Sequence, residues 1–91
     1  MAPRDTFVKG EARVPSITPL QLRLARTALR LGIRELADAA GVSPTTVTRF
    51  ESGRGGVHSG TLASLEAVLE KRGIVFVAAD GTGGATIRLK E

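Results

Sequence analysis

With 91 residues, no cysteine and a single histidine, the chain is long enough for one small domain and lacks a disulfide scaffold, a cysteine zinc site or a thiol nucleophile. It has no apolar run of membrane-spanning length and no signal-peptide core at its start, so we expect no membrane partner. The net charge is +4, and residues 1–54 carry nine basic against five acidic side chains. The whole positive excess therefore lies in this part, as expected of a surface that faces phosphate.

Residues 1–16 mix charged, Pro, Gly and small residues without a helical or strand period, and a flexible arm is expected there. The next segment predicts a helix over residues 18–31, since Thr18 suits the N-cap and Pro19 the first helical position. Its apolar side chains spread over an arc of about 200°, and one packed face explains about half of that. The rest needs cover from the C-terminal hairpin or from a second subunit.

Two short helices are expected at residues 33–40 and 44–52. Gly41 can take the positive φ that ends the first of them. Ser43 suits the N-cap of the second, and Pro44 its first position. This is the pattern of a helix-turn-helix, whose second helix can enter a groove of duplex DNA.

The C-terminal part predicts a fourth helix from Ser59 or Gly60 to Arg72, with Gly73 as its stop, and then two strands. The strands are expected at residues 74–79 and 85–90, with a turn at 80–84. The fold class is therefore mainly α: a four-helix helix-turn-helix domain over 17–72, after an arm over 1–16, and a two-stranded β-hairpin over 73–91.

The predicted hairpin has an apolar first strand, although two strands alone are marginal in water. One explanation is a dimer in which the hairpins of two subunits pair across a two-fold axis. The alternative is a hairpin that folds back on its own helices in a monomer. The dimer interpretation assigns the interface to Ile74, Val75, Phe76, Val77, Ile87 and Leu89.

The run Leu36-Ala37-x-x-Ala40-Gly41-Val42-Ser43-x-x-Thr46-Val47-x-Arg49-Phe50-Glu51-x-Gly53 resembles the Cro/phage-repressor class of helix-turn-helix proteins, the XRE family. The likeness extends over about residues 17–89, through Ile17-Thr18-Pro19, Thr61-Leu62-x-x-Leu65-Glu66-x-x-Leu69-Glu70 and Gly73-Ile74-x-Phe76, and indicates a small bacterial subgroup with a C-terminal hairpin. One position departs from the pattern. Ile33 stands where the family often has a Gln that contacts DNA phosphate, and Arg34 beside it can take over that contact.

The resemblance implies a homodimeric regulator of transcription that reads double-stranded DNA, more simply a repressor than an activator, in the cytoplasm and associated with the nucleoid. Bases are then contacted by Pro44, Thr45, Thr46 and Arg49. Arg49 is the most discriminating of these, because its planar fork can hold guanine O6 and N7 together. A phosphate contact, or an ion pair in solvent, is the alternative for this side chain.

Phosphates are expected to be contacted by Arg34, Thr48 and Arg54. Arg34 lies in the first turn of its helix, whose amides favour an anion, and Arg54 follows the reading helix where the family grips the backbone. The resemblance also implies that Arg26 and Glu51 form a structural ion pair. No cofactor, no metal site and no enzymatic activity are expected. Two other functions stay open: a module that binds another protein through the hairpin (antitoxin-like or a co-regulator), and a DNA-coating protein without sequence preference.

Overall fold

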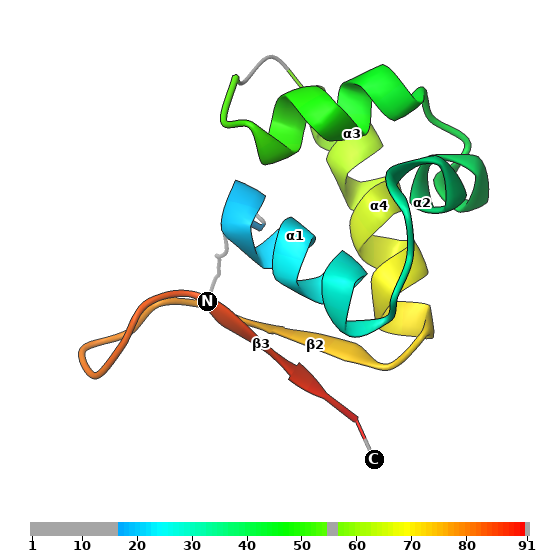
Figure 1. The fold of residues 1–91 in the computed structure, drawn as a ribbon. Coiled ribbons are helices and arrows are strands. Elements are labelled where there is room, and N and C mark those ends of the chain that lie inside the picture. The colour runs from blue at the N-terminus through cyan, green and yellow to red at the C-terminus, as the bar shows by residue number, and fades with distance from the viewer. Residues whose placement is uncertain (1–16, 55–56, 91) are drawn as a thin grey trace, which may run out of the picture.

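The structure, a computed structural model, describes residues 17–54 and 57–90, so the expected arm at 1–16 lies outside the described residues. These ranges fold into four helices followed by two strands (Figure 1). In chain order the elements are α1 (Pro19–Ala28), α2 (Ile33–Ala40), α3 (Pro44–Glu51), α4 (Ser59–Lys71), β2 (Ile74–Val77) and β3 (Thr86–Leu89). The predicted fold class, mainly helical with a C-terminal hairpin, is confirmed.

α1 begins at the predicted cap and ends earlier than predicted. The Thr18 hydroxyl accepts the amide of Gln21 at 3.0 Å, and the Gln21 side-chain oxygen accepts the amide of Thr18 at 2.9 Å, which together form a capping box. The helix stops at Ala28 and not at Leu31, because Arg30 adopts a left-handed conformation with φ of 58°. The Leu31 amide then donates to the Arg26 carbonyl at 2.9 Å.

The corner between α2 and α3 has the predicted local chemistry. Gly41 ends α2 with φ of 71°, and the amide of Val42 donates back to the Ala37 carbonyl at 2.9 Å. The hydroxyl of Ser43 accepts the Thr45 amide at 3.1 Å, and Pro44 occupies the first turn of α3. These contacts fix the direction in which α3 leaves the corner.

A mainly aliphatic core joins the helices to the first strand. Its members are buried and lie on all four helices, on β2 and just before the N-cap of α1: Ile17, Leu22, Ala25, Leu36, Ala37, Val47, Phe50, Leu65, Leu69 and Ile74. Replacing one of the fully buried leucines by alanine is expected to cost about 2–5 kcal/mol. This core holds α2 and α3 on α1 and α4.

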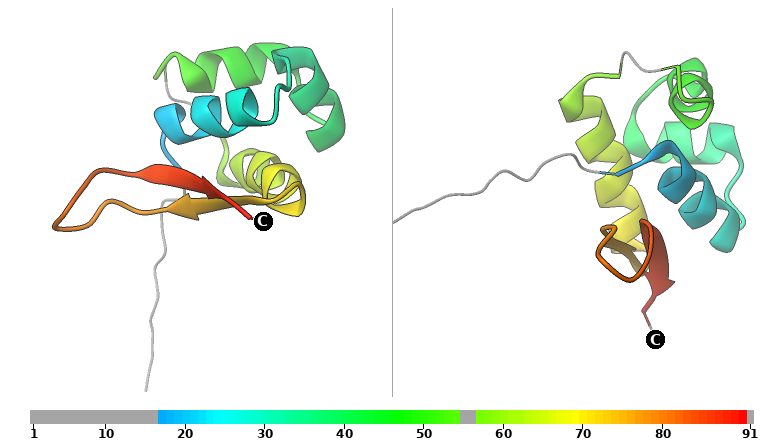
Figure 2. Two further views of the ribbon diagram at one scale, coloured as in Figure 1. Left: turned by 60° about the horizontal axis from the view of Figure 1, so that its bottom comes forward. Right: turned by 90° about the vertical axis from the view of Figure 1, so that its left-hand side faces the viewer.

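The hairpin folds back on its own helices, with β3 against α1 and β2 against α4. The antiparallel register pairs Ile74 with Leu89 and Phe76 with Ile87, so these four side chains share one face of the sheet. This face of the sheet packs on the core, because Ile74 is buried and Phe76 and Ile87 pack against the core. In both Figure 1 and the left view of Figure 2, α1 lies between the hairpin and α3.

A buried glutamine fastens the hairpin to α1. Gln21 is 3% exposed, and its side-chain nitrogen donates to the carbonyls of Val77 and Thr86, each at 2.9 Å. Val77 and Thr86 face each other in the ladder, so one side chain contacts both strands. Its oxygen is used by the capping box described above, and every polar atom of this buried amide therefore has a partner.

Candidate DNA-binding surface

α3 presents one polar stripe to solvent. Thr45, Thr48, Arg49 and Ser52 are exposed, while Val47 and Phe50 on the opposite side of the helix are buried. The spacing of the exposed residues keeps them on one side of a helix. The stripe therefore offers three hydroxyls and one guanidinium along the length of α3.

The four residues expected to contact bases differ in their exposure. Thr45 and Arg49 lie on the exposed stripe, where their side chains are free to meet a ligand. Pro44 and Thr46 are half-buried on its flanks. Thr45 and Arg49 are thus the more accessible of the four.

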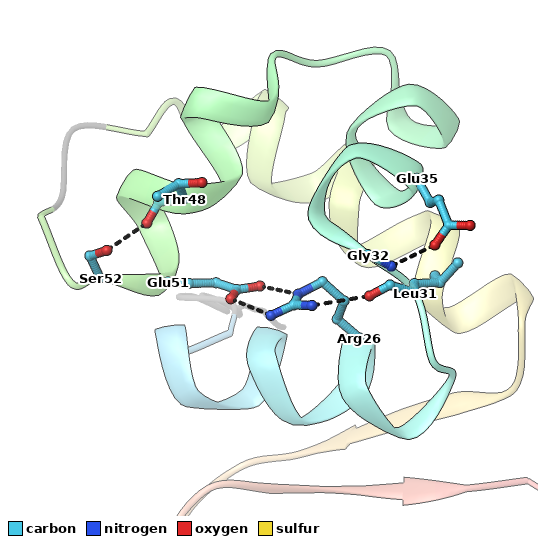
Figure 3. Close-up of polar contacts among 7 residues, drawn as sticks. All are labelled: Arg26, Leu31, Gly32, Glu35, Thr48, Glu51 and Ser52. Carbon is cyan, nitrogen blue, oxygen red and sulfur yellow. Dashed lines mark hydrogen bonds and ion pairs between the residues drawn. The ribbon is translucent and has the colours of Figure 1, made fainter.

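The ion pair between Arg26 and Glu51 is present and holds α3 against α1 (Figure 3). The Arg26 Nε donates to Glu51 Oε2 at 2.8 Å, Nη2 donates to Oε1 at 2.9 Å, and Nη1 donates to the Leu31 carbonyl at 3.0 Å. The two side chains are only 18% and 9% exposed. Such a two-pronged contact fixes orientation as well as distance. Since Glu51 closes α3, the pair sets the direction in which the exposed stripe faces.

This contact also stabilises the charged form of Arg26. The hydrogen bonds to Glu51 raise the pKa of Arg26 above its ordinary value, against the opposing effect of burial, and the charge of Glu51 adds to the rise. Arg26 thus stays cationic throughout the accessible pH range. Because its charge is matched by the Glu51 carboxylate, the pair adds little net potential to the surface.

Two of the residues expected to contact phosphate are exposed cations, at the start of α2 and after the end of α3. Arg34 lies in the first turn of α2, and Arg54 follows α3. Gly53 turns the chain with φ of 75°, and the amide of Arg54 donates to the Arg49 carbonyl at 3.0 Å. The third, Thr48, lies on the exposed stripe itself. Ile33, at the position where the family often has Gln, is half-buried.

A polar hollow of about 280 Å³ lies next to the exposed stripe, between three helices. It is lined by Arg23, Arg26, Ile33, Thr48, Glu51 and Ser52. Sequence reasoning missed Arg23 and Ser52 as candidate contacts. Two features of the sequence could have indicated them. The spacing of Ser52 from Thr45 places both side chains on the same face of a helix, and Arg23 is a cation one turn before Arg26.

The exposed polar side chains around α3 suit contacts with an anion. In the ranges 17–54 and 57–90 no cluster of three or more His, Asp or Glu side chains is placed to hold a metal ion. Within the same ranges, none of the helices combines the length and apolar character needed to span a bilayer. The exposed cations and hydroxyls around α3 match the chemistry of a phosphodiester backbone and of base edges.

A family model described as a helix-turn-helix domain matches residues 20–70, which cover α2, α3 and most of α1 and α4. The chain belongs to this helix-turn-helix family. The domain is found in XRE-like regulators, in agreement with the resemblance seen in the sequence. No curated protein is similar enough to this helix-turn-helix protein to count as a match. The family indicates DNA binding and is typically non-enzymatic.

Proposed function

We propose that this helix-turn-helix protein is a bacterial transcription regulator that recognises a specific sequence in double-stranded DNA. α3 lies in the major groove, and its exposed stripe contacts the bases. The protein acts as a homodimer, and as a repressor, because blocking a promoter needs no additional machinery. No catalytic step and no cofactor are part of this function.

The observation that carries the proposal is the fixed orientation of α3. The Arg26–Glu51 pair holds the end of the helix against α1, and the buried side chains of Val47 and Phe50 hold the helix on the core. A helix held in this way presents Thr45 and Arg49 in one defined arrangement before DNA arrives. Such preorganisation favours sequence reading over loose coating, because less ordering is lost on binding.

A selection experiment tests the proposal. Purified protein is mixed with fragmented genomic DNA at near-physiological salt, and the bound fragments are sequenced. The reading variant is Thr45→Ala/Arg49→Ala. The matched control is Ser59→Ala/Lys71→Ala, which also removes one hydroxyl and one positive charge, from exposed positions of α4.

The expected result is a shared inverted repeat that is enriched by the wild type and by the control and lost in the reading variant. Equal recovery of all sequences by all three proteins would show a DNA-coating protein. No recovery of DNA at all would favour the remaining alternative, a module that binds another protein through the hairpin.

A further inference from the structure

The lining of the hollow beside α3 carries a net positive charge. Its charged members are Arg23, Arg26 and Glu51, and two arginines against one glutamate leave a net charge of +1. Both oxygens of the Glu51 carboxylate accept from the Arg26 guanidinium, at 2.8 and 2.9 Å. These two charges therefore offset each other, and the excess comes from Arg23.

Arg23 is free to bind a ligand. Its side chain is exposed, and within residues 17–54 and 57–90 its guanidinium has no ion-pair or hydrogen-bond partner. All five of its N–H groups are available as donors. A guanidinium presents them in a planar fork that fits two oxygens of one phosphate. Arg23 can thus hold an anion without first giving up another contact.

The other polar groups of the hollow add donors (Figure 3). Arg26 uses three of its five N–H groups, on Glu51 and on the Leu31 carbonyl, and so keeps one on each terminal nitrogen. Thr48 is exposed, and in the described part of the chain its hydroxyl makes no hydrogen bond. Because the one lining carboxylate is already paired with Arg26, the hollow suits an anion better than a cation.

The size and place of the hollow also fit a phosphate group. A water molecule occupies about 30 Å³ in the liquid, so about 280 Å³ has room for several groups of that size. The lining includes Ile33, the first residue of α2. The positive end of the α2 dipole lies there and favours a negative charge.

A duplex that lies on α3 brings its backbone to this hollow. Thr48 and Ser52 belong both to the exposed stripe of α3 and to the lining. When the stripe meets base edges in the major groove, the phosphates that border the groove pass beside it. A phosphate can therefore enter the hollow while Thr45 and Arg49 face the bases.

We propose that the hollow receives one phosphate of the DNA backbone and that Arg23 is the residue that holds it. The Thr48 hydroxyl and a remaining N–H of Arg26 complete the contact. The phosphate then touches α1 and α3 together and fixes the position of the reading helix on the duplex. This inference rests on the proposed function, since it assigns one backbone contact of the same DNA-bound state.

Arg23 and Arg34 are assigned to different phosphates. Ile33 lines the hollow, whereas Arg34 beside it lies about 100° around α2 and is not part of the lining. Arg34 thus serves another phosphate, toward the side of α2 on which it lies. Each of the two cations is expected to be sensitive to the loss of its own phosphate charge.

Single methylphosphonates test the proposal, because each replaces one charged phosphate by a neutral group. They are placed one at a time along the selected DNA site, and binding is measured for the wild type, Arg23→Ala and Arg23→Lys. At one phosphate for each bound subunit, the neutral group is expected to weaken the wild type at least about tenfold and Arg23→Ala less than about twofold. Arg23→Lys keeps the charge and is expected to keep a penalty of at least about threefold. Penalties that are equal in Arg23→Ala and the wild type at every phosphate would overturn the proposal.

Arg34→Ala and Arg88→Ala are the matched controls, since each also removes one exposed arginine. Arg34→Ala is expected to lose the penalty at a different phosphate and to keep it at this one. Arg88 lies on β3, on the other side of α1 from α3, so Arg88→Ala is expected to keep every penalty (Figure 1). Circular dichroism checks that each variant stays folded. Loss of this penalty in Arg34→Ala and not in Arg23→Ala would overturn the assignment.

Inorganic phosphate tests whether the hollow takes a free anion instead. Millimolar phosphate is added to the protein without DNA, at constant ionic strength, and the NMR signal of the Arg23 side chain is followed. No saturating shift is expected, because a free ion gains none of the contacts between α3 and the bases. A saturating shift, together with methylphosphonate penalties that do not depend on Arg23, would assign the hollow to a free anion and overturn the proposal.

These measurements separate the hollow from sequence reading. A selected DNA site whose methylphosphonate penalties do not depend on Arg23 would overturn the phosphate site and leave the reading function of α3 intact. If no sequence is selected, the salt dependence of binding to a random duplex still tests the hollow. Arg23→Ala is then expected to lower the salt slope by about one, and an unchanged slope would overturn the proposal.

Discussion

The guanidinium of Arg26 donates to both carboxylate oxygens of Glu51, at 2.8 and 2.9 Å, and so joins the end of α3 to α1. The same guanidinium donates to the Leu31 carbonyl, which lies just before α2. One side chain therefore links α1, the start of α2 and the end of α3 (Figure 3). The relative position of the two helices of the reading corner depends on it.

Glu51→Ala is expected to lower the free energy of unfolding by on the order of 3 kcal/mol, because it leaves the half-buried Arg26 charge without its partner. Urea unfolding followed by circular dichroism measures this. Glu70→Ala, which removes an exposed carboxylate from α4, is the control and is expected to change stability by less than about 0.5 kcal/mol. Equal midpoints for the two variants would show that the pair contributes nothing to stability.

Gln21→Leu is expected to lower stability by about 1–2 kcal/mol, because it removes two hydrogen bonds to strand carbonyls and the acceptor of the capping box. The loss should be local. Hydrogen exchange measured by NMR is expected to speed up at the amides of β3 more than at those of α3. Gln21→Glu keeps the acceptor for Thr18 but places a carboxylate against two carbonyls, so it should be more damaging than Gln21→Leu. Unchanged exchange in β3 would mean that the hairpin is held by apolar contacts alone.

The parts of the fold that depend on local chemistry were predictable from the sequence. The cap at Thr18, the turn at Gly41 and the start of α3 at Pro44 each rest on residues within a few positions of one another. The end of α1 was not predictable in this way. Arg30 takes a left-handed conformation that a non-glycine residue seldom adopts, and nothing in the local sequence marks it.

Contacts between residues far apart in the sequence were predicted only where the family resemblance supplied them. The Arg26–Glu51 pair spans 25 residues and was predicted from the family resemblance, not from the spacing. The contacts of Gln21 span 56 and 65 residues, and in the sequence this residue is simply a polar member of an amphipathic helix. The hollow beside α3 was missed for the same reason, since its lining comes from three helices.

Gly41→Ala is expected to cost about 1–2 kcal/mol, because an L-residue is strained at a φ of 71°. No neighbouring atom lies within 4 Å of the added Cβ, so the whole cost is conformational. Gly60→Ala is the matched control. It also has open space around its Cβ, but it lies in α4 at an ordinary φ and is expected to stabilise by about 0.5 kcal/mol. Thermal unfolding of the two variants should therefore shift in opposite directions.

Asp80 is expected to stabilise the turn of the hairpin in a pH-dependent way. Its pKa is lowered by the hydroxyl of Thr82 and by the amides of Thr82 and Gly83, all of which donate to the same carboxylate oxygen. A lowered pKa means that this ordering is complete at neutral pH and is lost only as the pH falls through the folded-state value, below the ordinary range of an aspartate. The amide resonances of Thr82 and Gly83 should titrate there. In Asp80→Asn that titration should vanish, and its persistence would assign it to another group.

The cations around α3 should fall into two classes when binding to the selected site is measured against salt. Arg49→Ala is expected to cost about 1–3 kcal/mol at the selected site and to relax preference at one base pair. Arg34→Ala and Arg54→Ala are expected to weaken binding equally on all sequences and to lower the salt slope by about one each. Arg23→Ala behaves like them if the hollow receives a phosphate.

Lys71→Ala is the control for loss of charge, since Lys71 lies at the far end of α4, and it should leave the slope unchanged. The distinction depends on chemistry: a phosphate contact is the same at every base pair, whereas a guanidinium on a guanine edge is not. Binding by Arg49→Ala that is weakened equally for the selected site and for unrelated DNA would place Arg49 among the phosphate contacts. Specificity would then rest on the threonines of α3.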